Sequence, residues 1–442
     1  MKKIKEIKNT LGNIYLIIDN DKKTAQVNLQ IIQKEYKSIK YLMMLNSDGR
    51  DNEKVFYFIN YECYQEAYNS KLQSIQALKL LYSFSEIIRK KIEFFTKIDF
   101  NNFSRFILGQ SIHGVQEDWV FITRRSISTH NAYMATIRKY YKHLNLSDKS
   151  IFDNRVVGVN SSSYGLLAHT RKNNEIKFES NISKMRNRKV PKYITKEEYK
   201  DINRMYESKN NLLSLRNRVI IDLMYLKGLR LGEVLGLTLE DVKEHPDNRN
   251  AGLLTIRNRI SDKAYQHAKN SLHPLNKNDY KTEIYKERGI QKIVIPEGLK
   301  RTIDKYIFKS RDLSMLTDKF ISNMMMYSEA DAIETNQNNY YLFLSKNGTA
   351  LTSSGWNYNL KIIFNELNIH VDEGKKSINL SHRFRHGYAM YLIKELNLSL
   401  EEVSRYMRHR SISSTYVYYN PTEEEILESS EIIESKIEEF LE

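Results

Sequence analysis

The amino-terminal 60 residues contain short runs in which apolar and polar side chains alternate. Such runs cover residues 13–18, 25–30 and 54–59, with a turn-like Asn-Ser-Asp-Gly segment before the last run. Alternation with a period of two is typical of strands that bury one face. We therefore expect a small β-rich module over residues 1–60.

Apolar residues between about residues 62 and 152 are spaced as they are on helices. Leu78, Leu81 and Phe84 fall on a single stripe, because residues three and four apart share a helix face. Basic residues surround the apolar stripe of a second segment, which suits either a solvated face or contact with phosphates. These patterns predict a helical domain over residues 61–180.

A polar, basic stretch over residues 181–192 is typical of a linker, and the capping-box spacing of Thr195 and Glu198 predicts a helix directly after it. Helices and short strands alternate from there on. We expect helices at 212–227, 360–367, 382–396 and 399–407, and strands at 253–256 and 291–296. The expected fold is multidomain and mainly α, with the helical domain followed by a mixed α/β domain over residues 193–421.

The charge of the chain narrows the range of partners. Its 442 residues include 69 Lys and Arg against 54 Asp and Glu, a net charge of +15, which favours a polyanion. No apolar run approaches the roughly 20 residues of a membrane-spanning helix. We therefore expect a cytoplasmic protein with no membrane partner. The single cysteine, Cys63, excludes an intramolecular disulfide and is expected to be a small buried residue.

Three short segments in the carboxyl-terminal half carry candidate chemistry. They are Gly228-Leu229-Arg230-Leu231-Gly232-Glu233, His382-Arg383-Phe384-Arg385-His386-Gly387, and Arg408-His409 with Tyr418 nine residues after the histidine. Cleavage of a phosphodiester without a metal needs cations at the non-bridging oxygens, a nucleophile in line and an acid for the leaving oxygen. Arginine matches phosphate with its planar fork, and tyrosine can form a covalent phosphotyrosine.

In order, spacing and flanking apolar residues, these segments resemble the tyrosine recombinase, or phage integrase, family over roughly residues 191–420. The helical region before them fits the family's core-binding domain in position and length. The resemblance implies that Arg230 and Arg385 clamp the scissile phosphate, and that Glu233 supports them as the usual acidic companion.

The same resemblance assigns roles to three histidines and one tyrosine. His382 would transfer a proton or bond the phosphate, and His409 would also bond the phosphate. His386 would support the site or pack beneath it. Tyr418 would be the nucleophile.

Each assignment has an alternative. Arg230 and Glu233 could form a surface ion pair of little energetic weight. His382 and His386, four residues apart, could form a helical metal pair, but no Glu stands in a His-Glu-x-x-His arrangement and no third ligand is evident nearby. We therefore expect neither a metal nor another cofactor.

Tyr418 has close neighbours in Tyr416 and Tyr419, among 30 tyrosines in the chain. The spacing from His409 favours Tyr418. We expect the other two to be packing residues or contacts to DNA.

The general-acid lysine is the least defined member of the set. The family carries it in a hairpin between the two predicted strands, where Lys281-Thr282 resembles the Lys-Thr of many members. The distance from Lys281 to Pro296 is about twice the usual gap, and Arg288, a poor acid, stands at the usual distance. We predict Lys281 as the acid, with Lys286 as the alternative.

Two residues depart from the family's pattern. Arg408 stands where the family usually has Gly before the histidine, and Gly387 replaces a small hydroxyl residue. Neither removes a catalytic group, but both could alter packing around the site.

Residues 422–442 hold nine Glu against one Lys and fit an acidic amphipathic helix or tail. In the family such a segment often docks on a neighbouring protomer.

What the resemblance implies is a site-specific recombinase of the integrase or transposase type, belonging to a mobile element. It would cut double-stranded DNA through a 3′-phosphotyrosyl bond and rejoin it through a Holliday junction, without ATP. A homo-oligomer, a tetramer on DNA, would act in the bacterial cytoplasm at the nucleoid, and an accessory directionality factor is a further candidate partner.

Three other functions compete with this prediction. A type IB topoisomerase-like enzyme shares the chemistry but acts as a monomer without strand exchange. A catalytically lapsed DNA-binding regulator would keep only the binding. A metal-dependent transposase would need a carboxylate triad, and none stands out in the sequence.

Overall fold

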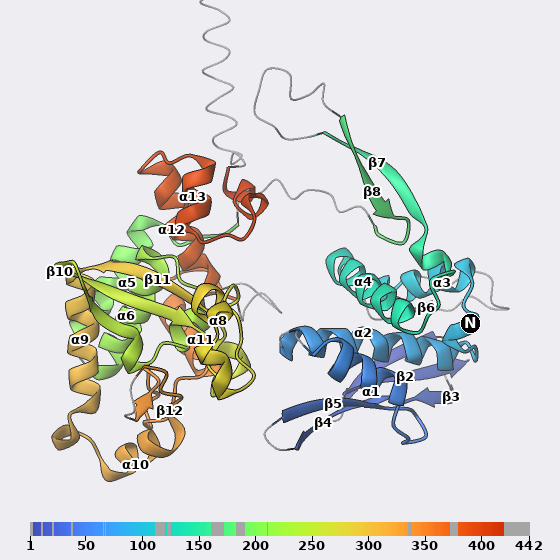
Figure 1. Ribbon diagram of the computed structural model, residues 1–442, viewed down its shortest axis with the longest axis horizontal. Helices are drawn as coiled ribbons and strands as arrows, with labels where there is room; N and C mark the ends of the chain where they lie inside the picture. Colours follow the sequence, from blue (N-terminus) through green and yellow to red (C-terminus); the bar gives the residue numbers. More distant parts are fainter. Residues whose placement is uncertain are drawn as a thin grey trace, which may run out of the picture. The chain divides into compact units, whose positions relative to one another are not determined.

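Two units, Met1–Arg186 and Asn187–Glu442, make up the computed structural model (Figure 1). The structure describes residues 3–9, 12–19, 22–36, 39–64, 66, 68–110, 120–121, 125–160, 172–182, 191–209, 211–334, 338–371 and 379–419. Most of the predicted linker and the whole acidic segment 422–442 lie outside these residues.

The β-rich amino-terminal module is present and contains two small sheets. The first has the strand order β3-β2-β1-β6, and the second is the hairpin β4-β5. The strands are β1 (Lys3–Asn9), β2 (Gly12–Asp19), β3 (Lys22–Val27), β4 (Gln30–Tyr36), β5 (Ile39–Leu45) and β6 (Val120–Phe121). The strand predicted at 13–18 is confirmed, whereas the one predicted at 25–30 is divided between β3 and β4.

The strand predicted at 54–59 is wrong, because this segment is helical. It forms α1 (Glu53–Tyr57) and a following π-helical turn, Phe58–Glu62. Asn52 caps α1 by accepting a hydrogen bond from the Val55 N–H at 3.1 Å. A strand and a helix would both bury Val55 and Ile59, but a strand would also bury Tyr57, whereas a helix would bury Phe58. In the structure Tyr57 is 56% exposed and Phe58 is buried. The burial therefore follows helical spacing.

The strands of the first unit share a single hydrophobic core with its helices. These helices are α2 (Tyr68–Ile87), α3 (Lys97–Leu108) and α4 (Ile127–His143). Leu42 of β5, Leu78 of α2 and Ile137 of α4 are all buried in this core, and so is Cys63. The helices thus have the expected apolar stripes, and the strands have no separate core of their own.

A hairpin follows α4 where the sequence predicted more of the helical domain. It consists of β7 (Asn154–Asn160) and β8 (Lys172–Phe178), paired antiparallel. Arg138 of α4 anchors its base, since the guanidinium lies 4.0 Å from the centre of the Phe178 ring and donates to Ser180 Oγ at 2.7 Å. The expectation of helical structure up to residue 180 is therefore wrong for these residues.

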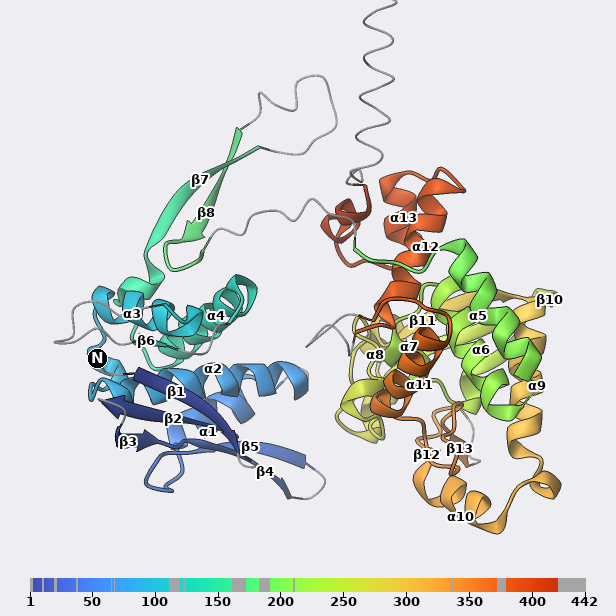
Figure 2. The same ribbon diagram turned by 180° about the vertical axis from the view of Figure 1, so that it is seen from behind.

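The second unit combines helices with an antiparallel sheet of strand order β11-β10-β9, seen from behind in Figure 2. Its strands are β9 (Val242–His245), β10 (Asn248–Arg257), β11 (Ile290–Pro296), β12 (Glu329–Ala330) and β13 (Asn339–Tyr340). Its helices are α5 (Lys196–Lys209), α6 (Leu212–Leu226), α7 (Leu231–Leu235), α8 (Glu283–Arg288), α9 (Glu297–Arg311), α10 (Asp318–Tyr327), α11 (Ser353–Glu366), α12 (His382–Lys394) and α13 (Leu400–Tyr406). The two predicted strands of this unit are confirmed in β10 and β11.

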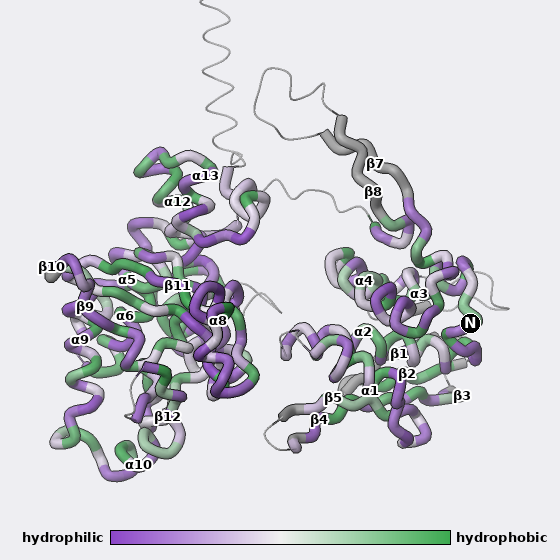
Figure 3. Tube along the Cα trace, in the orientation of Figure 1, coloured by the Kyte–Doolittle hydropathy of each residue, from purple (hydrophilic) through white to green (hydrophobic). Residues whose placement is uncertain are grey.

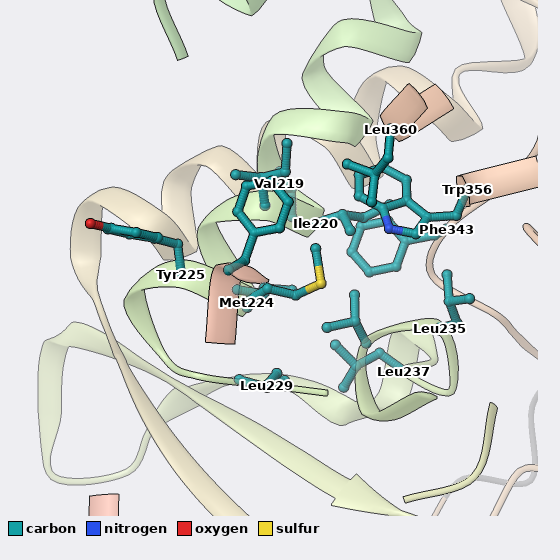
Figure 4. Close-up of a cluster of buried hydrophobic side chains, with 14 of the residues drawn as sticks. Val219, Ile220, Met224, Tyr225, Leu229, Leu235, Leu237, Phe343, Trp356 and Leu360 are labelled. Atoms are coloured by element: carbon teal, nitrogen blue, oxygen red, sulfur yellow. The ribbon is translucent and has the colours of Figure 1, made fainter. Parts of the chain in front are cut away.

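Helix α6 is the centre of this unit, because α5, α9 and α12 all pack against it. Val219, Ile220 and Met224 of α6 meet Trp356 and Leu360 of α11 in the core (Figure 4). The long connection from β10 to β11 is hydrophilic over α8 and its flanking loops (Figure 3). None of the helices in the described ranges is long and apolar enough to span a membrane.

Candidate active site

Arg230 stands at the amino-terminal end of the short helix α7, after a tight turn. Gly228 adopts φ +59° in this turn, and a Cβ there would lie 2.4 Å from the Tyr388 ring. Glu233, one turn into α7, accepts from the Arg230 backbone N–H at 2.9 Å and from Arg230 Nη1 at 2.8 Å. Because Glu233 is only 2% exposed, the two residues do not form a surface ion pair.

Helix α12 contributes His382, Arg385 and His386, whose spacing places them along one side of the helix. The Arg385 guanidinium is buried and donates hydrogen bonds to the backbone carbonyls of Gly228 and Met407. These contacts tie α12 both to the turn before Arg230 and to the end of α13. Arg230, His382 and Arg385 line one small cavity of about 40 Å³.

Tyr418 lies on the 3₁₀ turn Tyr416–Tyr418 and is 5% exposed. Its hydroxyl is joined to His386 Nδ1 by a hydrogen bond of 2.7 Å. Burial raises the pKa of Tyr418, while the positive charges of Arg385 and Arg230 act to lower it. The hydroxyl of Tyr419, in contrast, donates to the Leu398 carbonyl at 2.6 Å.

The ring of His409 is stacked parallel to that of Tyr418, with ring centres 6.3 Å apart and planes 7° apart. His409 Nδ1 is hydrogen-bonded to Thr415 Oγ1 at 2.8 Å, which fixes the ring. Burial, together with the charges of Arg385 and Arg230, lowers the pKa of His409 to about 4. The imidazole is therefore neutral near pH 7.

Positive charge dominates the cluster. Burial alone would raise the pKa of Glu233, but Arg408, Arg230 and Arg385 hold it below its usual value. The pKa of His382 is lowered, first by burial and then by the charges of Arg385, Arg230 and Lys269. One ionised carboxylate among several cations leaves a site suited to an anion such as phosphate.

The five predicted catalytic groups other than lysine thus meet in one cluster, together with Glu233 and His386. The model of the phage integrase family matches residues 192–425, more than half of the chain. The chain belongs to the phage integrase family.

Two curated relatives match a similar part of the chain. Transposase A from transposon Tn554 of Staphylococcus aureus is 26% identical over 241 residues, which is 54% of this chain and 56% of the relative. Tyrosine recombinase XerD of Oceanobacillus iheyensis is 25% identical over 240 residues, 54% of this chain and 60% of the relative. The match therefore spans little more than half of either relative.

Among solved structures, the Tn1549 transposon integrase in complex with transposon right end DNA matches at 13% identity and a TM-score of 0.49. The match covers 86% of this chain and 99% of that chain.

The lysines predicted from the integrase pattern lie elsewhere. Lys281 is exposed and lines a different cleft, with Lys277, Tyr280 and Asp331. Lys286 is exposed and pairs with Glu283 at 2.7 Å. Within the described ranges, no recorded contact connects either lysine with the cluster around Tyr418.

Lys269 is the lysine whose charge acts on the cluster, through its effect on His382. It is exposed and lies in the β10–β11 connection, three residues after the 3₁₀ turn Ala264–Gln266 that packs on α7. Lys269 was not among the lysines predicted from the sequence, and its distance from Pro296 is even greater than that of Lys281. The only sequence signal was its place between the two predicted strands.

Gly387 and Arg408 are the two residues that depart from the integrase pattern, and the structure shows how each is accommodated. At Gly387 an added Cβ would lie 2.5 Å from the Ile194 carbonyl oxygen and 2.7 Å from the Tyr225 ring, so the usual hydroxyl residue does not fit. Arg408 adopts φ +51°, a conformation that explains why glycine is usual there.

The rings of His382 and His386, four residues apart on α12, are stacked with their centres 6.0 Å apart. His386 Nδ1 is already engaged with Tyr418. In the part of the chain that the structure describes, no group of three or more His, Cys, Asp or Glu side chains is placed to hold a metal ion.

Proposed function

We propose that this chain is a site-specific DNA recombinase of the integrase or transposase type, which cuts and rejoins strands through a 3′-phosphotyrosyl intermediate. The observation that carries the proposal is the position of Tyr418. Its hydroxyl is hydrogen-bonded to His386 and lies in the electrostatic field of Arg230 and Arg385. A phenol in a buried cationic cluster is suited to attack a phosphate that the same cations bind.

In the proposed reaction Arg230 and Arg385 bind the non-bridging oxygens of the scissile phosphate. The Tyr418 oxygen forms a bond to phosphorus and its proton passes to a neutral imidazole of the cluster. The bond from phosphorus to the 5′ oxygen breaks, and Lys269 supplies the proton that this oxygen takes up. Attack by the 5′-hydroxyl of a partner strand reverses these steps and reseals the exchanged strand.

Burial and the neighbouring cations lower the pKa values of these imidazoles and so keep them neutral, and the negative charge of a bound phosphate would raise the values again and strengthen the imidazoles as bases. The pKa of His386 falls to about 3 and that of His409 to about 4, so both are unprotonated at neutral pH. His386, which contacts the phenol, is placed to orient it.

The proposal includes an organisation into parts and partners. Residues 1–60 and 61–180 would contact DNA, residues 181–192 would link them to a catalytic domain over 193–421, and residues 422–442 would dock on a neighbouring protomer. Lys281, the acid predicted from the sequence, and Lys286 are the alternatives to Lys269 as the proton donor. A tetramer on duplex DNA in the bacterial nucleoid, assisted by a directionality factor, would complete strand exchange through a Holliday junction.

Covalent trapping in cells tests the proposal. DNA attached to the wild-type chain is recovered from expressing cells, and the modified peptide and the cut position are mapped. We expect Tyr418 to carry a 3′-phosphate, Tyr418→Phe to abolish the adduct, and Tyr416→Phe to retain it. EDTA should not prevent its formation.

Other outcomes would identify the competing functions. An adduct without exchange between two marked sites would indicate a topoisomerase-like enzyme. DNA binding without any adduct would indicate a lapsed regulator and would refute the proposed chemistry.

A further inference from the structure

Arg408 occupies a backbone position that glycine would fill without strain. It follows α13 directly after Met407 and adopts φ +51°, in the left-handed region. A side chain is disfavoured in this conformation because Cβ approaches the backbone oxygen, whereas glycine adopts it freely. Arginine at this position is therefore expected to make contacts that offset the strain.

The side chain of Arg408 makes such a contact. Its Nη2 lies 2.6 Å from Glu233 Oε2, and both side chains are shielded, at 16% and 0% exposure. The other oxygen of Glu233 accepts from Arg230 Nη1 at 2.8 Å. Glu233 is thus shared by two guanidinium groups, those of Arg408 and Arg230.

The backbone of the same residue makes a second contact. The Arg408 carbonyl accepts a hydrogen bond from Asn270 Nδ2 at 2.9 Å, and Asn270 directly follows Lys269. The preceding carbonyl, that of Met407, accepts from Arg385. Two consecutive carbonyls therefore hold the second phosphate-binding arginine and the segment that carries the lysine.

We infer that Arg408 is a positioning residue that links the two halves of the reaction. Its side chain orients Glu233 and, through it, Arg230. Its carbonyl holds Asn270 and so places Lys269 near the leaving oxygen. This inference rests on the proposed function, in which Arg230 binds the phosphate and Lys269 is the acid.

The two contacts can be tested separately. Arg408→Gly removes the side chain but keeps the carbonyl, and it suits the positive φ. Asn270→Ala removes the contact to the carbonyl but leaves the Arg408 side chain in place. Arg408→Lys restores a positive charge without the guanidinium fork. Arg405→Ala, which removes an exposed arginine of α13, is the charge-matched control for Arg408→Gly.

Two nicked duplexes serve as probes, both containing the cut site mapped on DNA from cells. One carries the ordinary phosphodiester, and the other carries sulfur in place of the 5′-bridging oxygen. A thiolate leaves without protonation, so loss of the acid does not slow cleavage of the second duplex. The rate of covalent complex formation is measured at saturating protein, from pH 5 to 9.

We expect Arg408→Gly to slow cleavage at least tenfold on both duplexes, with a melting temperature equal to or above that of the wild type. Because Glu233 loses an attractive charge, its pKa should rise, and the acidic limb of the pH profile should move to higher pH. Arg408→Lys should recover part of the rate. Asn270→Ala should slow cleavage of the ordinary duplex only, and Arg405→Ala should cleave like the wild type.

Wild-type rates in Arg408→Gly on both duplexes would overturn the inference. So would a slow Arg408→Gly with a lowered melting temperature and an unmoved pH profile, because that combination indicates a purely structural role. If the wild type forms no covalent complex with either duplex, the proposed function itself fails, and the two failures are thereby distinguished.

Discussion

At Gly232, helix α7 lies close to the connection that carries Lys269. A Cβ at Gly232 would lie 2.6 Å from the carbonyl oxygen of His267 and 3.2 Å from that of Tyr265, whereas ordinary contact begins at 3.4 Å. Both obstacles are backbone atoms, which a rotamer change does not move. In Gly232→Ala the connection must therefore shift by roughly 0.8 Å.

The expected cost has two opposing parts. Overpacking of this kind costs about 1–3 kcal/mol. Alanine in place of glycine inside a helix stabilises the folded state by up to about 1 kcal/mol. We expect the free energy of unfolding of Gly232→Ala to fall by up to about 3 kcal/mol.

An effect on catalysis should accompany the effect on stability, because Lys269 is two residues beyond His267. A displacement near 1 Å in an active site can cost about 100-fold in rate. We therefore expect cleavage of the ordinary duplex by Gly232→Ala to fall by about 10- to 100-fold. The duplex with the sulfur leaving group should be cleaved nearly as fast as by the wild type.

Urea denaturation and single-turnover cleavage measure the two effects, and Gly298→Ala is the matched control. Gly298 is also the second residue of its helix, α9, but a Cβ there meets nothing within 4 Å. This control should be as stable as the wild type or more so, with unchanged cleavage. The reasoning is refuted if Gly232→Ala folds and cleaves the ordinary duplex at the wild-type rate.

Further predictions concern α12 and the histidines. Gly387→Ser should reduce the free energy of unfolding by about 1–3 kcal/mol in urea denaturation, because its Cβ would collide with the Ile194 carbonyl. Arg385→Lys should cost about 1.5–3 kcal/mol in the same assay, since an ammonium cannot reach the carbonyls of both Gly228 and Met407 as the fork does; it should also abolish the covalent adduct. The pKa values of His386 and His409 are depressed to about 3 and about 4, so the unfolded chain binds more protons below pH about 6.5, and stability should fall as the pH drops towards the folded values. Equal urea midpoints at pH 7.5 and pH 5 would contradict this.

The parts of the fold that were predictable from sequence are those in which local pattern and tertiary packing agree. Apolar spacing gave α2 and α4, and the predicted strand residues pair in register, with Leu253 opposite Val294. The order and spacing of the three motifs also predicted that Arg230, Arg385 and Tyr418 lie close together, and in the structure they form one cluster. A buried charged side chain needs partners, and the motif residues are partners of each other.

Predictions of structure from the sequence were wrong where the pattern of apolar residues fits two structures equally well. At 54–59 the apolar residues satisfy both a strand and a helix, and the Asn52 cap together with burial of Phe58 decides for the helix. Spacing along the sequence does not tell which lysine of the β10–β11 connection lies nearest the cluster, because this connection contains its own turns. The path of the connection depends on contacts of the turn Ala264–Gln266 with α7 and of Asn270 with Arg408, and Arg408 lies far away in sequence.

The contacts of Arg385 explain why motif spacing is informative in this protein at all. A guanidinium that is 3% exposed must be satisfied by acceptors, and here the carbonyls of Gly228 and Met407 supply them. Those two carbonyls directly precede the segments Leu229-Arg230 and Arg408-His409. Burying Arg385 therefore brings both other motifs to the same place before any DNA binds, so Arg230 and Tyr418, the proposed phosphate clamp and nucleophile, are brought together by folding. It follows that substitutions of Arg385 should affect stability and cleavage together, whereas substitutions of Arg408 should separate them.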